Sequence, residues 1–251
     1  MSKTRTDLIS ILLSAAVAVA ASLGCTAAVA LGLQVSPILV ELPVGSKATE
    51  LWLVNTSDQA MQAQVRVYQW EQKEGVSVLI PTSDLIVSPP VVKIAAKGEQ
   101  MVRVIRGKGA SGATSPVLAF RLLVNELPHT GQKKKSGIDF VVEYSVPTFV
   151  YQQPADKLQP QVNLSMVRQG NKVKVAANNN GDLYGKLSQV HFVDKQGKRT
   201  TLADGLLGYV LPQREARWDI KQAPNVFAQG GTMELLLNGK TYTQAIPPLS
   251  R

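Results

Sequence analysis

The stretch GIDFVVEYSVPTFVYQQP, residues 137–154, decides how the chain folds. Apolar side chains occupy every second position over most of it, and polar side chains stand between them. The apolar positions are Ile138, Phe140, Val142, Tyr144 and Val146, and the polar ones are Asp139, Glu143 and Ser145. This period of two predicts a long β-strand with one apolar face. Either the protein's own core or a bound partner must cover that face.

Alternating runs of the same kind fill the chain on both sides, and a helical period is almost absent. LQVSPILVEL, ATELWLVNTSDQ, MQAQVRVYQWEQKEG, SPPVVKIAAKGEQMVRVIRG and SPVLAFRLLVNELP precede the opening stretch. Turn signals separate them about every 8 to 12 residues, the spacing of an antiparallel β-sandwich. The first part of the chain is therefore predicted to be an immunoglobulin-like sandwich.

The apolar alternation breaks at YQQPADKLQP, residues 151–160, which predicts a linker. Alternation then resumes, with turns at Gln169-Gly170-Asn171, Asn180-Gly181-Asp182, Lys195-Gln196-Gly197 and Asn238-Gly239-Lys240. The sequence thus predicts an all-β protein of two domains, residues 31–152 and 153–251. The second is expected to be a smaller sandwich or a barrel.

The first thirty residues have the pattern of a secretory signal peptide. Lys3 and Arg5 precede an apolar run, and small residues at Ala28 and Ala30 favour cleavage after Ala30. A permanent membrane helix is the alternative, but no basic cluster follows the run. A lipoprotein site at Cys25 is disfavoured because Ser22 stands where a large aliphatic residue is expected. We expect export without stable membrane insertion after cleavage.

Composition limits the possible partners. Cleavage after Ala30 leaves 221 residues without the chain's single cysteine, so core burial must stabilise the fold. It also removes two basic residues and one acidic residue, which lowers the formal net charge from +9 to +8. Such a charge suits nucleic acid, an anionic membrane or acidic partners, or a generally solvated basic surface. The one dense basic cluster, QKKKSG, has no stacking aromatics beside it, so we predict no nucleic-acid binding.

The sequence does not predict an enzyme. Its two histidines, His129 and His191, are too few for a metal site once Cys25 is removed. No phosphate loop, dinucleotide fingerprint or nucleophile elbow is present. We therefore expect neither cofactor nor metal, although an active site assembled only by the fold stays open. The opening strand suggests binding instead, because a long apolar strand after a flexible basic loop is what strand addition to a partner requires.

Several stretches resemble the PapD-like periplasmic chaperones of the chaperone–usher pilus pathway. They are LQVSPILVELP, LIVSPPVVKIAAKGEQMVRVIR, FRLLVNELP and FVVEYSVPTFV, and GLLGYVLPQREARWDI is similar in the second domain. The resemblance implies two immunoglobulin-like sandwiches arranged like a boomerang, in the periplasm. It also implies a chaperone that lends a strand to incomplete pilus subunits and delivers them to an outer-membrane usher.

The resemblance also assigns residues. Ile138, Phe140, Val142 and Tyr144 correspond to the donated side chains. The loop residues Lys133, Lys134 and Lys135 are candidates for steering an acidic subunit.

Two positions depart from the better-studied branch and resemble the divergent archaic or alternative branch. Leu39 and Pro147 stand where basic residues usually hold the subunit's C-terminal carboxylate. Arg103 and Arg121 are the candidate replacements, and an ion pair with Glu126 or plain exposure is the alternative for each. Because Pro147 lacks an N–H, the strand ladder is expected to be interrupted or turned there.

Two other classes of protein compete with this interpretation. A two-domain surface adhesin or pilus structural component would share the β-sandwich pattern. A hydrolase or carbohydrate-binding module would need clustered carboxylates or exposed aromatics. Trp52, Trp70 and Trp218 are scattered through predicted strands, so we expect them in the core.

Overall fold

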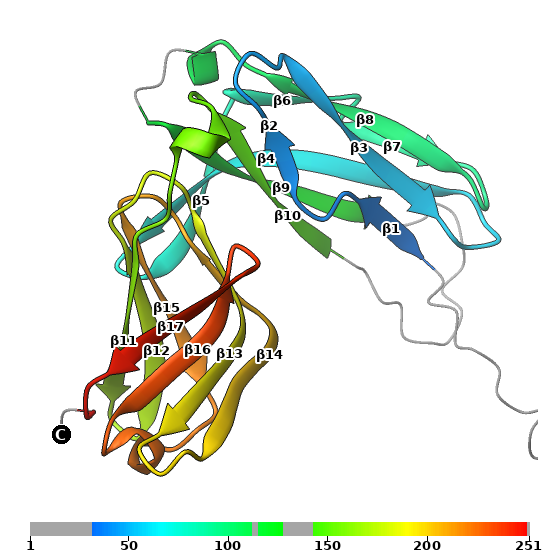
Figure 1. Cartoon of the computed structure of the whole chain (residues 1–251). Helices are drawn as coiled ribbons and strands as arrows, with labels where there is room; N and C mark the ends of the chain where they lie inside the picture. The colour runs from blue at the N-terminus through cyan, green and yellow to red at the C-terminus, as the bar shows by residue number, and fades with distance from the viewer. Residues whose placement is uncertain (1–31, 112–114, 128–142, 250–251) are drawn as a thin grey trace, which may run out of the picture. The chain divides into compact units, whose positions relative to one another are not determined.

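The computed structural model describes residues 32–111, 115–127 and 143–249 (Figure 1). The described strands belong to one compact unit, Leu33–Arg251. They are joined by turns and three single-turn 3₁₀ helices, so the described chain is all-β, as predicted. The predicted signal peptide, residues 1–30, lies outside the described residues.

The first ten strands form two sheets. Their bounds are β1 (Leu33–Ser36), β2 (Val40–Leu42), β3 (Ala48–Asn55), β4 (Met61–Lys73), β5 (Val76–Pro81), β6 (Leu85–Ser88), β7 (Val91–Ile94), β8 (Glu99–Arg106), β9 (Val117–Leu127) and β10 (Glu143–Tyr151). One sheet has the order β1-β3-β8-β6. The other has the order β2-β10-β9-β4-β5, with β7 also paired to β4. All the pairs are antiparallel except β2 with β10.

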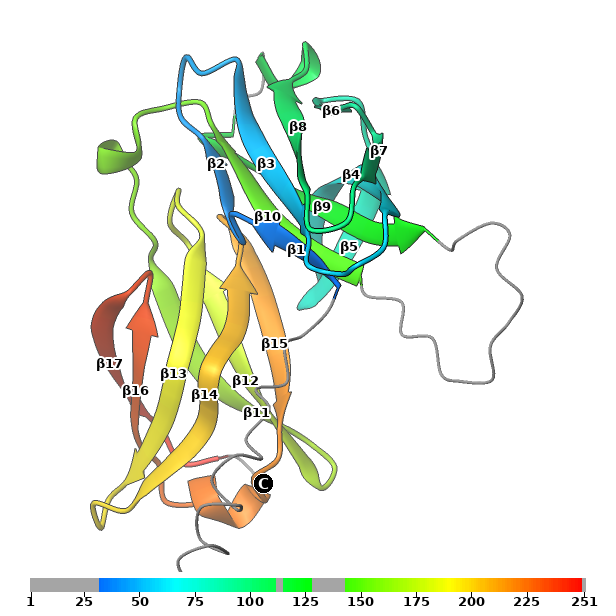
Figure 2. The ribbon, with the colours of Figure 1, turned by 90° about the vertical axis from the view of Figure 1, so that its right-hand side faces the viewer.

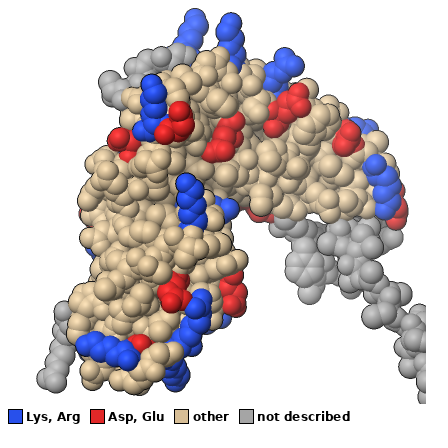
Figure 3. Space-filling model, in the orientation of Figure 1, with Lys and Arg blue, Asp and Glu red and all other residues tan. Residues whose placement is uncertain are grey.

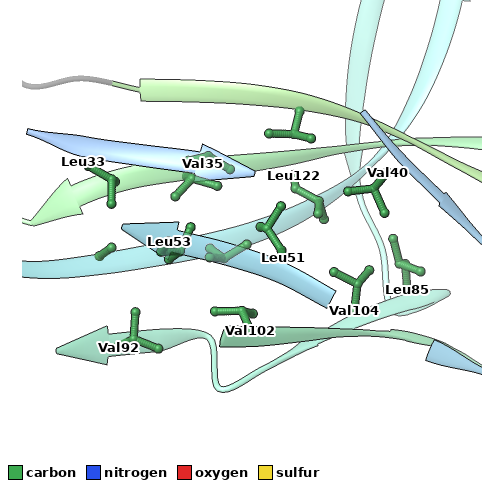
Figure 4. Close-up of a cluster of buried hydrophobic side chains, with 14 of the residues drawn as sticks. Leu33, Val35, Val40, Leu51, Leu53, Leu85, Val92, Val102, Val104 and Leu122 are labelled. Carbon is green, nitrogen blue, oxygen red and sulfur yellow. The ribbon is translucent and has the colours of Figure 1, made fainter. Parts of the chain in front are cut away.

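The inner faces of these sheets enclose one aliphatic core (Figure 4). Leu51 and Leu53 of β3 lie beside Val102 and Val104 of β8, and Leu122 of β9 packs from the opposite sheet. All five are fully buried. Each such side chain contributes roughly 1.5–3 kcal/mol relative to exposure, which explains how a fold without disulfides holds together.

The remaining seven strands form a second sandwich. Their bounds are β11 (Val162–Gln169), β12 (Lys172–Asn179), β13 (Gly185–Asp194), β14 (Arg199–Val210), β15 (Arg214–Ile220), β16 (Gly231–Leu237) and β17 (Lys240–Ile246). The sheets have the orders β11-β12-β15 and β14-β13-β16-β17. This core is centred on Phe192 and Phe227, whose rings meet edge to face at 4.9 Å. Of the two predicted forms, the sandwich is confirmed.

Each sandwich contains one fully buried asparagine that joins its loops. Asn55 donates to the carbonyls of Gln59 and Ala95 and accepts from the backbone N–H of Ser57. Asn179 donates to the carbonyl of Leu183 and accepts from the N–H groups of residues 161 and 181. A buried side-chain amide that satisfies several backbone groups fixes loops that have no ladder of their own.

The segment predicted as a linker is packed. β10 ends at Tyr151, a 3₁₀ turn (Ala155–Lys157) follows, and the next residue, Leu158, is only 2% exposed. The sequence predicted a linker there because Pro, Gln and charged residues replace the apolar alternation. Leu158 is the apolar residue that ties the connection to a buried cluster.

Charge is spread thinly over the surface. On the face drawn in Figure 3, Lys and Arg side chains lie interspersed with Asp and Glu, separated by wide uncharged areas. The described residues include no helix that is both long and apolar enough to cross a bilayer.

Candidate functional site

A third buried cluster lies apart from the two sandwich cores and is built mainly of aromatic rings. Its members are Trp70 of β4, Val117 of β9, Phe149 and Tyr151 of β10, Leu158, Tyr184, Tyr209 of β14, and Leu211. The rings of Phe149 and Tyr184 stack with centroids 3.7 Å apart, and Trp70 meets Tyr209 edge-on at 5.8 Å. The cluster therefore joins β4, β9 and β10 to strand and loop residues of the second sandwich. Leu39, at one of the usual basic positions, packs against it as an apolar side chain.

Arg121 lies at the margin of this cluster. Its guanidinium carbon is 3.7 Å from the centroid of the Trp70 ring and 5.7 Å from that of Tyr209. One nitrogen donates to the carbonyl of Ser145 on β10, at 3.2 Å. Burial lowers the pKa of the guanidinium, although arginine stays protonated at ordinary pH. The aromatic faces hold a partly desolvated positive charge in place, which favours an anion beside it.

Arg121 has no acidic partner among the described ion pairs. Ion pairs are formed by Arg66, Arg199, Arg217 and three lysines, and none of the pairs among the described residues includes Arg121. The predicted alternative, an ion pair with Glu126, is therefore not formed. Because a guanidinium has five N–H donors, Arg121 retains donors for a carboxylate.

A carboxylate and two tyrosines form the polar side of the cluster. The Glu41 Oε1 atom accepts hydrogen bonds from the hydroxyls of Tyr151, at 2.5 Å, and Tyr184, at 3.0 Å. Burial, reinforced by Glu41, raises the pKa of both tyrosines well above the ordinary value. Both hydroxyls thus stay protonated and serve as donors that fix the loop before β13 against β2 and β10.

Gln72 of β4 makes a second polar link. Its Nε2 atom donates to the carbonyl of Tyr209 at 2.7 Å, and its Oε1 atom accepts from the N–H of Leu211 at 2.8 Å. The side-chain amide thus pairs with the backbone as a neighbouring strand would. Gln72 is 5% exposed, so both bonds are sheltered from water.

The strand β10 has an open edge beside Arg121. β10 pairs with β9 along its whole length, from Glu143 to Tyr151, but with β2 only at Thr148–Val150. Within the described part of the chain, residues 143–147 therefore have a strand partner on one side only. The register with β9 passes through Pro147 without a shift, so the ladder on that side of β10 is not interrupted there. The proline is accommodated just before the β2 pairing begins.

The other predicted site residues are placed as follows. Tyr144 is half-buried against the first core, and its hydroxyl donates to the carbonyl of Leu33 at 2.5 Å. Arg103 is exposed on β8, where it pairs with Glu50 of β3. These two strands belong to a different sheet from β9, so Arg103 is not brought together with Arg121. Ile138, Phe140, Val142, Lys133, Lys134 and Lys135 lie outside the described residues.

The tryptophans are only partly as predicted. Trp70 is buried and Trp218 packs against the second core, but Trp52 is 36% exposed and donates to Glu50, so its placement in the core was wrong. Gln72, Tyr184 and Tyr209 were not predicted from the sequence as parts of a site. The signal for them was weak, because each stands in an ordinary strand or turn context.

The described residues contain no group of three or more metal-ligating side chains. His191 is in β13, where its Nδ1 atom lies 3.2 Å from the hydroxyl of Thr201. His191 is not one of the residues of the aromatic cluster.

The comparisons identify the class of protein. Residues 32–155 match the family of pili and flagellar-assembly chaperones, PapD N-terminal domain. The CsuC chaperone from archaic Csu pili of Acinetobacter baumannii, solved with CsuE, superposes with a TM-score of 0.67 and 24% identity. The match covers 87% of this chain and 99% of that one. No curated protein sequence matches the chain.

Other solved chaperones share the fold at lower identity. SafB of Salmonella enterica, solved with the SafA pilin, gives a TM-score of 0.57 at 16% identity, covering 87% of this chain and 97% of that one. DraB of E. coli gives 0.56 at 18% identity, covering 88% and 97%. The chain belongs to the PapD-like chaperones of the chaperone–usher pathway, a family without catalytic activity.

Proposed function

We propose that the protein is a periplasmic chaperone that binds incomplete pilus subunits by donating a strand and delivers them to an outer-membrane usher. The family match supports the class of function, and the complexes of CsuC with a tip subunit and of SafB with a pilin support the kind of partner. The observation that carries the proposal is the open edge of β10 at residues 143–147.

An open strand edge presents unpaired N–H and C=O groups to which another chain can add a strand. A pilus subunit that lacks its last strand has an open groove in which a donated strand can pair. Its groove would receive the alternate side chains of the donor strand, while the main chain supplies hydrogen bonds.

The apolar stripe upstream of β10 supplies those side chains. In the sequence, Ile138, Phe140 and Val142 have the same parity as Tyr144 and Val146, and the proposal assigns them to an extension of the donor strand. Tyr144 already packs on the first core, so we assign the donated set to the first three. Burying three such side chains contributes about 5–9 kcal/mol before the ordering cost is subtracted.

Arg121 is the proposed anchor for the subunit's C-terminal carboxylate. It lies on β9, next to the open edge of β10, bonds Ser145, and has no acidic partner of its own among the described ion pairs. Arg103 is the weaker candidate because it projects from the opposite sheet. We keep Lys133, Lys134 and Lys135 as a steering loop for an acidic subunit.

The proposal also covers export, the domain boundaries and the branch of the family. Export would remove residues 1–30 and release the chaperone into the periplasm. The first domain, residues 31–152, would carry the donor strand, and residues 153–251 would form the second domain. The likeness to CsuC supports placing the chain in the archaic branch.

The test is subunit capture in the periplasm. The mature protein is co-expressed with candidate pilus subunits that lack their last strand, and Phe140→Asp/Val142→Asp is compared with wild type. Ile86→Asp/Val91→Asp is the matched control, because it adds the same two charges at exposed aliphatic positions of β6 and β7. We expect stable one-to-one capture by wild type and control and none by the donor-strand variant.

Circular dichroism of each variant separates binding from folding. Loss of capture with the fold intact supports the donated stripe. Unfolding of the Phe140→Asp/Val142→Asp variant would instead place these residues in the protein's own core. The adhesin or pilus-component alternative would then be preferred.

A further inference from the structure

The strand β5, Val76–Pro81, is an edge strand that carries no charged residue and whose one usual protection is the proline at its end. Its sequence VSVLIP contains no charge, whereas natural edge strands are normally short or carry charged residues. Val76 is 64% exposed and Leu79 is 38% exposed. The other outer strands of the four described sheets each have one of these protections. The strands β11, β14, β15 and β17 carry charged residues, and β1, β2 and β6 have four residues or fewer. β5 is the anomaly among them.

The hairpin geometry shows which backbone groups of β5 are free. β4 and β5 are joined by the two-residue turn Glu74-Gly75, whose φ angles are both positive, at 53° and 80°. Such a turn places Lys73 and Val76 as a hydrogen-bonded pair, and such pairs recur at every second residue. Val76, Val78 and Ile80 thus bond to β4, and the N–H and C=O groups of Ser77 and Leu79 point outward.

Nothing in the described part of the chain pairs with these outward groups. The second sandwich meets this hairpin at its turn, where Gly75 bridges Ala216 and its carbonyl accepts from the N–H of Arg217, and at Gln72 of β4. Figure 2 shows β5 as the outermost strand of its sheet, with β10 and β2 toward the other margin. The free edge is therefore continuous over Ser77 and Leu79.

We propose that β5 pairs antiparallel with β5 of a second copy of this chain, across a two-fold axis at Val78. In this register Ser77 lies opposite Leu79 of the second copy, so all four outward groups of each strand are satisfied. Pro81, which has no N–H, falls outside the pairing.

The side chains of the strand are also self-complementary in this register. Val78 faces Val78 of the second copy, and Val76 faces Ile80 of the second copy, so one face becomes a continuous aliphatic stripe. Since residues 76–81 carry no charge, the pairing of two β5 strands brings no like charges together. The strand also has no charged side chains that would favour a partner of opposite charge. An isologous pair of one self-complementary patch is the commonest form of homodimer.

This dimer is independent of the proposed strand donation. β5 and β10 belong to different margins of the same sheet, separated by β9 and β4. Pairing through β5 leaves residues 143–147 of β10 open. A failure of either proposal therefore leaves the other standing.

The test is the oligomeric state of the mature protein by sedimentation velocity over a range of concentrations. We expect a monomer–dimer equilibrium whose dissociation constant rises about tenfold or more in Val78→Lys, because two lysines would then face each other on the axis. Val78→Glu is expected to behave in the same way. Mixing the two variants in equal amounts should restore the dimer as a heterodimer, because opposite charges then meet.

Controls keep this test decisive. Val91→Lys adds the same charge on β7, at an aliphatic residue exposed to 45%, and should dimerise like wild type. If Val78→Lys does not fold by circular dichroism, Leu79→Pro replaces it in the test, because it removes an outward N–H without removing a hydrogen bond to β4. A wild type that is monomeric throughout, a Val78→Lys dimer as tight as wild type, or a mixture that stays monomeric each overturns the proposal.

Discussion

Replacing Gln72 with methionine should destabilise the protein strongly, although the change is small in volume. The substitution leaves the carbonyl of Tyr209 and the N–H of Leu211 without their partners in a site where Gln72 is 5% exposed. Each buried unsatisfied group costs about 1–3 kcal/mol. Since methionine fills nearly the same space, little cavity cost is added, and partial hydration reduces the upper figure. We expect a loss of about 2–4 kcal/mol in the free energy of unfolding.

Guanidinium denaturation followed by tryptophan fluorescence measures this loss. The matched control is Gln62→Met, the same change at an exposed position of the same strand, which should stay within about 0.5 kcal/mol of wild type. A loss below about 0.5 kcal/mol for Gln72→Met would refute the reasoning, because the two backbone groups would then be satisfied without the side chain.

Gln72→Glu adds a dependence on pH with a definite sign. An ionised glutamate can accept from Leu211 but cannot donate to the carbonyl of Tyr209, and burial also disfavours its charge. The pKa of this glutamate is thus raised in the folded state, so the folded state binds more protons than the unfolded state. Stability should be closest to wild type at acid pH and should fall as pH rises above the unfolded value of about 4.3. A Gln72→Glu variant whose deficit is the same at pH 4 and pH 8 would contradict this assignment.

Three further predictions concern single sites. Arg121→Ala should weaken subunit binding by about 10- to 100-fold, measured by titration calorimetry, and Arg121→Lys should recover only part of it, because lysine cannot bind a carboxylate bidentately. Gly208→Ala should lower the unfolding midpoint, since its new Cβ would lie 2.2 Å from Nε1 of Trp218, whereas Gly205→Ala on the same strand meets nothing within 4 Å and should be tolerated. Asn179→Ala should cost about 2–4 kcal/mol in denaturation, because it leaves several loop N–H and C=O groups without partners.

Alternation and turn chemistry predicted most of the fold. The predicted turns at Gly170, Gly197 and Gly239 are present, and all three glycines have positive φ. Lys97 also has a positive φ, of 54°, in the turn between β7 and β8 where the sequence indicated two short strands. These features are local, so the sequence within a few residues determines them.

The errors concern contacts between residues that are far apart in the sequence. The sequence predicted a linker at residues 151–160, but its composition could not reveal that Leu158 packs with the aromatic cluster. Trp52 was expected in the core because it lies in a predicted strand. Its position between the buried Leu51 and Leu53 in β3, however, places its side chain on the other face of the sheet. Here parity within the strand was a better guide than residue type.

The same parity rule could have located the candidate site. In β4, Val65 faces the first core, while Trp70 has the opposite parity and lies in the aromatic cluster. In β10, Val150 faces the first core and Phe149 faces the cluster. Arg121 lies on the cluster side of β9, the strand between them. A sheet whose second face is solvated would carry polar residues at these positions. Large aromatic side chains that have the opposite parity to the core residues on neighbouring strands therefore indicate that the second face of the sheet is also buried. An arginine among them indicates the edge of that buried face, where an anion can approach.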